Sequence, residues 1–134
     1  MTQDLKDLLL QDLSARLPYG VKFKSENAER VYFIDTSDNE IYINGTHIED
    51  VKLYLFPLSS LTSKQRTEIG KILTDTQKQY SPYGVVNTEG CDNLFICSVK
   101  QSNALINYCL SQHLDINGLI EKDSAIDATN LNIY

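Results

Sequence analysis

Long apolar runs and clusters of basic residues are both missing from this chain of 134 residues. The longest apolar stretches are three or four residues, as in Leu8–Leu10 and Leu53–Phe56, whereas a bilayer-spanning helix needs about 20. Twelve Lys and Arg are scattered among 18 Asp and Glu, although binding several phosphates requires clustered basic side chains. We therefore expect neither a membrane nor a nucleic acid as partner.

Cysteine and histidine are scarce, with three cysteines and two histidines. An odd number of cysteines, together with a first 20 residues that lack the pattern of a secretory signal, indicates reduced thiols and a cytoplasmic protein. The glycine motifs of phosphate loops and the G-x-S-x-G elbow of hydrolases do not occur. We predict no cofactor and assign no catalytic residue, so the chain is more typical of a non-enzyme.

The composition is that of a folded, acidic protein, with 42% hydrophobic residues, 22% charged residues and a net charge of −6. This length suits one domain over residues 1–134. The polar segment 127–134 carries only single apolar residues, and we expect it to be loosely ordered.

Three stretches have the apolar spacing and end signals of α-helices. The first, 3–17, follows a potential N-cap at Thr2 and ends at Pro18–Gly20. The second, 63–79, follows a capping box formed by Thr62 and Gln65. The third is expected from about residue 98 to about 113.

Residues 21–55 have the β-rich composition and turn signals of four or five short antiparallel strands. Ser37–Asn39 is a predicted turn, and Asn44–Gly45 is the strongest short hairpin signal, because both residues tolerate positive φ. Val85–Val86 and Leu94–Ile96 are candidates for a further small hairpin. The order of elements predicts an α+β fold with an N-terminal helix, an antiparallel β-meander and two further helices packed on the sheet.

Cys109 and His113 lie four residues apart on the third predicted helix, a spacing that could place two metal ligands or a thiol and a base on one face. A zinc site needs two more ligands, and no CxxC or HxxxH pair supplies them. A packed thiol and a histidine near a helix end explain the spacing as well. We assign no metal ligand and keep a small metal- or thiol-dependent enzyme as the alternative function.

Two groups of residues, tyrosines at turns and lysines on one helix face, are candidates for binding a partner. Tyr19, Tyr80 and Tyr83 fall at predicted helix ends and turns, where exposed rings can anchor a protein partner. On the helix predicted at 63–79, Lys64, Lys71 and Lys78 repeat every seven residues, near Arg66. This stripe would be the only basis for nucleic-acid binding, and a solvated helix face explains it better.

Three segments carry a family resemblance: 12–22 (DLSARLPYGVK), 52–65 (KLYLFPLSSLTSKQ) and 118–134 (GLIEKDSAIDATNLNIY). They resemble an uncharacterised family of short proteins encoded by gut Bacteroidales and by prophages and mobile elements in their genomes. The resemblance implies a context but no activity, cofactor or site residue. Together with the absent catalytic motifs, it leads us to expect a non-enzymatic protein-interaction module, phage- or mobile-element-derived, that acts on a host or phage protein.

Overall fold

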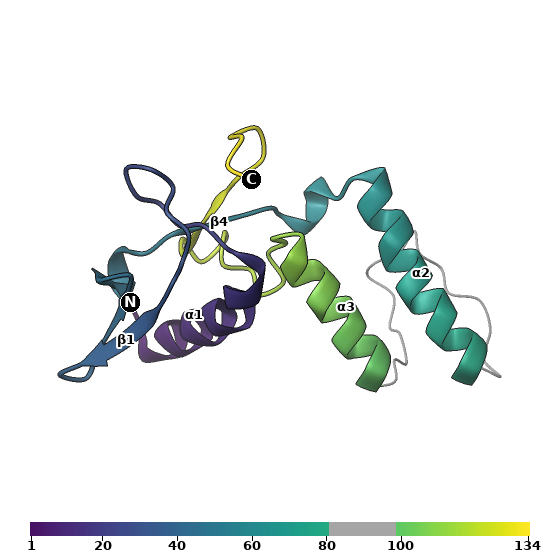
Figure 1. Ribbon diagram of the computed structural model, residues 1–134, viewed down its shortest axis with the longest axis horizontal. Helices are drawn as coiled ribbons and strands as arrows, with labels where there is room; N and C mark the ends of the chain where they lie inside the picture. The colour runs from purple at the N-terminus through teal and green to yellow at the C-terminus, as the bar shows by residue number, and fades with distance from the viewer. Residues whose placement is uncertain (81–98) are drawn as a thin grey trace. The chain divides into compact units, whose positions relative to one another are not determined.

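The structure is a computed structural model that describes residues 1–80 and 99–134, with side chains described over 1–73 and 102–134 (Figure 1). The contacts group the chain into two compact units. The first consists of Met1–Ser60 with Leu110–Tyr134, and the second of Leu61–Cys109. The small hairpin expected within 85–97 lies outside the described residues, and the single-domain organisation stays a prediction.

The N-terminal helix is confirmed as α1, Gln3–Arg16. Its start is set by Thr2, whose Oγ1 accepts a hydrogen bond from the Leu5 N–H at 3.2 Å. A 3₁₀ turn, Leu17–Tyr19, follows, and Gly20 then adopts a φ of +75° that favours glycine. The predicted stop at this position is therefore confirmed.

Three short strands form an antiparallel meander in the order β1-β2-β3. They are β1, Ile34–Ser37; β2, Glu40–Ile43; and β3, Thr46–His47. Both connections are two-residue turns in which each residue has positive φ: 52° and 63° at Asp38 and Asn39, 49° and 82° at Asn44 and Gly45. These are type I′ turns, whose twist matches that of the flanking strands, so both turn predictions are confirmed.

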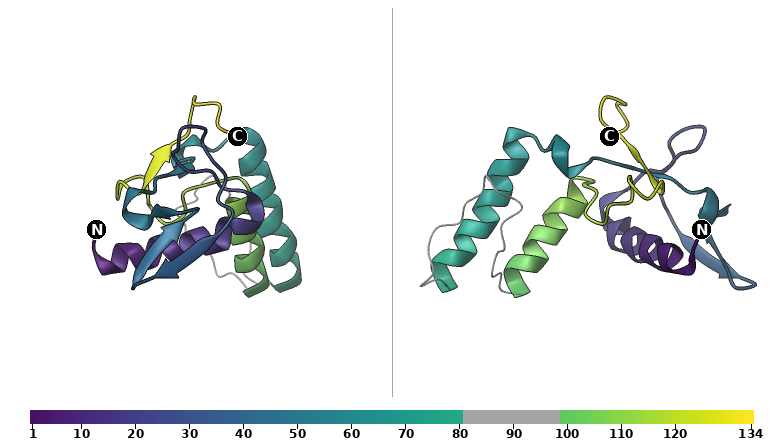
Figure 2. Two further views of the ribbon diagram at one scale, coloured as in Figure 1. Left: turned by 60° about the vertical axis from the view of Figure 1, so that its left-hand side comes forward. Right: turned by 180° about the vertical axis from the view of Figure 1, so that it is seen from behind.

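The last predicted strand of the meander pairs elsewhere, and this expectation was wrong. Residues Leu53–Leu55 form β4, which lies parallel to β5, Ala125–Asp127, in a separate two-stranded sheet (Figure 2). A short 3₁₀ helix, Ile48–Asp50, separates β4 from β3 and redirects the chain. On its other side β4 meets Phe23 through an isolated antiparallel bridge. The parallel partner was not predicted as a strand, and its last residue, Asp127, is the first residue of the segment 127–134 that we expected to be loosely ordered.

The hydrophobic core of the first unit joins one face of α1 to both sheets. Leu9 and Leu13 of α1 are fully buried, as are Ile43 of β2 and Leu53 of β4. Complete burial of such a side chain is worth about 1.5–3 kcal/mol each. Leu119 completes this core from the segment before β5.

The second unit contains helix α2, Ser63–Tyr80, and most of helix α3, Val99–Ser111. The predicted capping box is confirmed: Thr62 N–H donates to Gln65 Oε1 at 2.9 Å, and Gln65 N–H donates to Thr62 Oγ1 at 3.1 Å. A 3₁₀ turn, Leu58–Ser60, precedes it. Over the described residues, no helix combines the length and the apolar character that crossing a membrane requires.

Candidate interaction surface

Two adjacent aromatic side chains are exposed on the first unit. Tyr32 is 68% exposed and Phe33 is 54% exposed, the highest fractions among the large apolar side chains that the structure describes. Their neighbours behave differently: Val31 is buried, and Ile34 packs against the core. Because two consecutive residues face outward, the strict inward–outward alternation of a strand is broken here.

The side chain of Asn44 holds this aromatic segment in place. Its Oδ1 accepts hydrogen bonds from the N–H groups of Tyr32 and Phe33, at 2.8 and 3.1 Å. Its Nδ2 donates to the carbonyl of Arg30 at 2.7 Å. The side-chain amide of Asn44 therefore bonds to the backbone of three residues and fixes the course of the chain just before β1. Asn44 thus has two roles. Its positive φ forms the turn between β2 and β3, and its side-chain amide holds the backbone of the aromatic segment.

Strand β1 is an edge of the three-stranded sheet and pairs only with β2 among the described residues. The Asn44 N–H donates to the Phe33 carbonyl at 3.1 Å, so position 33 bonds toward β2. Bonding direction alternates along an antiparallel strand. The N–H and C=O groups of Ile34 and Thr36 therefore point away from β2. We call residues 32–37 the β1 edge.

The outer face of this sheet carries aromatic and acidic side chains. Phe33 and Asp35 share this face by alternation, and Tyr42 is the cross-strand partner of Asp35. Tyr42 also makes an edge-on ring contact with His47 at 5.6 Å between centroids. His47 Nε2 pairs with Glu40 Oε2 at 2.5 Å, whereas Asp35 has no ion-pair partner in the described part of the chain.

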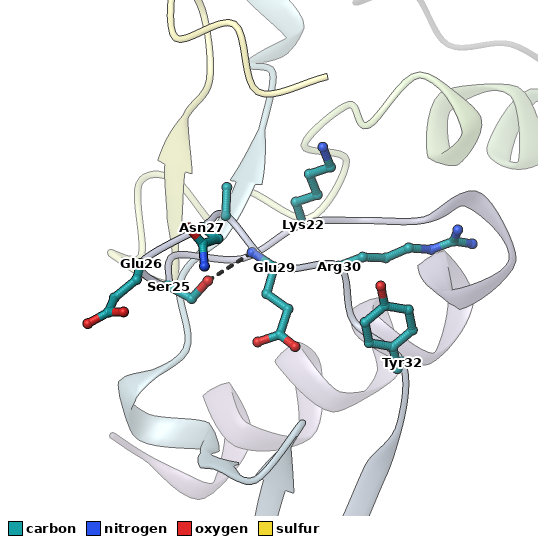
Figure 3. A pocket seen from close by; sticks show the side chains of 8 residues that line it. Lys22, Ser25, Glu26, Asn27, Glu29, Arg30 and Tyr32 are labelled. Atoms are coloured by element: carbon teal, nitrogen blue, oxygen red, sulfur yellow. Dashed lines mark hydrogen bonds between the residues drawn. The ribbon is translucent and has the colours of Figure 1, made fainter.

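A depression open to solvent adjoins the β1 edge and includes Tyr32 in its lining (Figure 3). It is formed mainly by the loop of residues 25–30, in which Ser25 Oγ accepts a hydrogen bond from the Glu29 N–H at 2.8 Å. Its four charged side chains balance, two basic and two acidic: Lys22, Glu26, Glu29 and Arg30. The depression is thus an extension of the aromatic surface rather than an enclosed reaction site.

A buried ion pair lies elsewhere in the first unit, at the C-terminal end of α1. Arg16 and Asp12 are almost inaccessible to solvent, and the Arg16 Nε contacts Asp12 Oδ1 at 2.5 Å. Arg16 Nη2 also donates to the Leu114 carbonyl at 2.7 Å, and Asn117 Nδ2 donates to Asp12 Oδ2 at 2.7 Å. These contacts tie α1 to the chain that follows α3.

His113 and Tyr134 stack beside this pair, with ring centroids 3.7 Å apart and planes 10° from parallel. The Tyr134 hydroxyl accepts from the Lys22 N–H at 2.9 Å and donates to the Tyr54 carbonyl at 2.8 Å. Burial, followed by the charges of Arg16 and Lys22, lowers the pKa of His113 to about 4. Burial raises the pKa of Tyr134 to about 12. We call Asp12, Arg16, His113 and Tyr134 the Arg16–Tyr134 cluster.

The structure places the residues singled out from the sequence in different settings. Tyr19 is half-buried in the turn after α1, Tyr80 is the last residue of α2, and Tyr83 lies outside the described residues. Their role in partner binding stays a prediction.

Cys109 and His113 do not share one helix. Cys109 is buried in α3, but α3 ends at Ser111 and His113 has a left-handed backbone with a φ of +58°. Throughout the part of the chain that the structure describes, no group of three or more His, Cys, Asp or Glu side chains is arranged to hold a metal ion.

Sequence reasoning missed the exposed pair Tyr32–Phe33. The run Val31–Ile34 was interpreted as a β-rich run within the predicted strands of residues 21–55, with no separate expectation for its two aromatic side chains. The available signal was the length of the run. Four consecutive apolar residues cannot all face one core from a half-buried strand, because alternate side chains face opposite sides of a sheet.

Comparison with known proteins adds no relative. No protein-family model matches the chain, and neither the curated proteins nor the solved structures contain a match. The geometry of the first unit is therefore the basis for a proposed function.

Proposed function

We propose that this chain is a non-enzymatic protein-interaction module, derived from a phage or mobile element, and that its partner is a host or phage protein. The β1 edge is its contact surface. The observation that carries this proposal is the exposure of two adjacent aromatic side chains, Tyr32 and Phe33, directly before strand β1, which is paired on one side only in the described structure.

The energetics of association favour such a surface. Tyrosine and phenylalanine bury large areas with few rotatable bonds, and aromatic residues are enriched at the centres of protein interfaces. The backbone of both residues is already held by Asn44, so binding would cost little further ordering. The other exposed apolar side chains that the structure describes in this unit, such as Leu131, are not adjacent aromatic pairs, and isolated ones are ordinary on a surface.

Site-specific photocrosslinking tests the proposal. A benzophenone amino acid in place of Phe33 is expected to crosslink one protein from a lysate of the native host, which mass spectrometry would identify. The matched control carries the same group in place of Leu131, whose exposure of 47% is similar. The double variant Tyr32→Ser, Phe33→Ser should retain its fold and capture at least about tenfold less partner, since aromatic anchors are each worth about 2 kcal/mol or more.

Two results would contradict this assignment. Equal crosslinking from positions 33 and 131 would indicate non-specific association. Crosslinking to a partner that the double variant retains at full strength would place the contact surface elsewhere on the chain.

A further inference from the structure

The β1 edge is suited to strand addition, in which a partner segment extends the sheet. Building on the proposed function, we propose that the partner contributes an extended strand with basic side chains at alternate positions, which hydrogen-bonds to the free side of β1. Backbone hydrogen bonds would supply affinity in such a complex, and the alternate side chains would supply specificity.

The backbone supports this mode of binding. The outward N–H and C=O groups of Ile34 and Thr36 have no partner among the described residues, and they recur at the two-residue spacing that an added strand requires. Side chains at 35–37 are exposed, so nothing described covers this edge. An uncovered strand edge is a template for pairing; β1 contains neither lysine nor proline, and its one charged residue, Asp35, would repel acidic strands but not basic ones.

The charge of the hairpin defines the partner. Residues 34–43 contain three acidic residues and no Lys or Arg. Glu40 is engaged by His47, but Asp35 and Asp38 are exposed and have no ion-pair partner in the described structure. A basic strand would therefore be attracted to this edge, and an acidic one would be repelled.

The position of Asp35 explains why the basic residues should alternate. Tyr42 is its cross-strand partner and Phe33 lies two residues before it in the chain, so both rings belong to the same face of the sheet as its carboxylate. A lysine or arginine on the same face of the added strand can pair with Asp35 while its aliphatic stem and charge lie against an aromatic ring. The intervening residues would lie beside Ile34 and Thr36, on the face toward the core, where β-branched or apolar side chains fit.

A second copy of this chain is a poor occupant of the same edge. Pairing of β1 with itself about a two-fold axis is antiparallel. Because the strand has four residues, any such register brings Asp35 and Asp38 of both copies into the same short stretch. Like charges at cross-strand positions destabilise a sheet, so the charge pattern favours a different, basic chain.

Peptide selection on the full-length chain tests the inference. Random 12-residue peptides displayed on phage are selected for binding, and the enriched sequences are expected to alternate Lys or Arg with β-branched or apolar residues and to lack proline. The best peptide is then synthesised and its affinity measured by calorimetry. Asp35→Lys should weaken it at least about tenfold, as should Lys→Glu changes in the peptide, because a close charge pair contributes about 1.5 kcal/mol or more.

Backbone methylation of the peptide distinguishes strand addition from other modes without altering the protein. N-methylation of every second residue should abolish binding in one register and leave it nearly unchanged in the other, because only alternate N–H groups face β1. Thr36→Pro removes an outward N–H and should abolish binding, whereas Thr36→Ala should not. Circular dichroism would verify that both variants are folded.

The outcomes separate the two proposals. If the selected peptides bind in a Phe33-dependent manner but tolerate methylation in both registers, or are proline-rich or acidic, strand addition by a basic segment is wrong and the interaction module stands. If no selected peptide depends on Tyr32 or Phe33, the contact surface itself is wrong. A dimer in sedimentation experiments that Thr36→Pro converts to monomer would make a second copy the occupant and overturn the inference.

Discussion

Tyr134 and Tyr32 belong to the same compact unit but are used in opposite ways. The Tyr134 ring stacks on His113, and its hydroxyl bridges the Lys22 N–H and the Tyr54 carbonyl. Tyr32 is 68% exposed, and only its backbone N–H is held, by Asn44. The ring and hydroxyl of Tyr134 therefore make contacts within the fold, whereas the side chain of Tyr32 is accessible to a partner.

The same contrast extends to the charges around each ring. In the Arg16–Tyr134 cluster the carboxylate of Asp12 is buried against a guanidinium and an amide. At the β1 edge the carboxylate of Asp35 is exposed and has no ion-pair partner in the described structure. Buried polar groups must find hydrogen-bond partners inside the fold, so substitutions there should change stability. Exposed, unpaired groups beside apolar rings can contact a partner, so substitutions there should change binding.

Removal of Asp12 should have the largest effect on stability. Asp12→Ala leaves the Arg16 guanidinium buried without its carboxylate and should lower the free energy of unfolding by about 3–5 kcal/mol. The matched control is Lys52→Met, which removes the ion pair with Asp123 at an exposed position and should cost less than about 1 kcal/mol. Urea denaturation followed by circular dichroism measures both. Equal losses would show that burial does not distinguish the two pairs.

Acid should weaken the Arg16–Tyr134 cluster through His113. Its pKa is about 4 in the folded chain against 6.5 normally, so between these values the unfolded chain binds more protons. Stability from this group is therefore complete above pH 6.5 and is lost as the pH falls toward 4, by an amount on the order of 2 kcal/mol. His113→Asn, which tolerates the positive φ, should show a flatter pH dependence of unfolding than the parent protein. Parallel pH profiles would contradict the assignment.

The smallest effects come from removing single hydroxyl groups. Tyr134→Phe removes two hydrogen bonds, to the Lys22 N–H and the Tyr54 carbonyl, and should destabilise the chain by about 0.5–1.5 kcal/mol because both bonds are accessible to water. Tyr32→Phe removes an exposed hydroxyl and should change stability by less than about 0.5 kcal/mol. Thermal unfolding of the two variants side by side provides the comparison. A larger loss from the Tyr32 variant would reverse it.

Features encoded by residues close in sequence were predictable. The cap at Thr2, the capping box of Thr62 and Gln65 and the turn at Asn44–Gly45 each depend on residues at most three positions apart. The α+β class followed from the order of such elements. Local hydrogen bonds and backbone preferences are sufficient to form all of these features, because none of the features requires contact with a segment distant in the sequence.

Features that depend on distant partners were not predictable. Residues 53–55 have the alternation of a meander strand, and only the arrival of 125–127 makes them part of a parallel pair. The exposure of Tyr32 and Phe33 depends on a side-chain contact with Asn44, which is 11 and 12 positions away. Apolar composition alone does not show which side chains of the run Val31–Ile34 are exposed, since that depends on the rest of the fold.

The sequence by itself determined the helices, the turns and the acidic character of this protein, because propensity, capping and charge are properties of neighbouring residues. Only the tertiary structure decided that Arg16 is buried, that segment 125–127 completes a sheet and that the β1 edge has no further strand partner among the described residues. Each of these outcomes depends on which surfaces compete for the same core. That competition is settled by long-range packing, which no local pattern specifies.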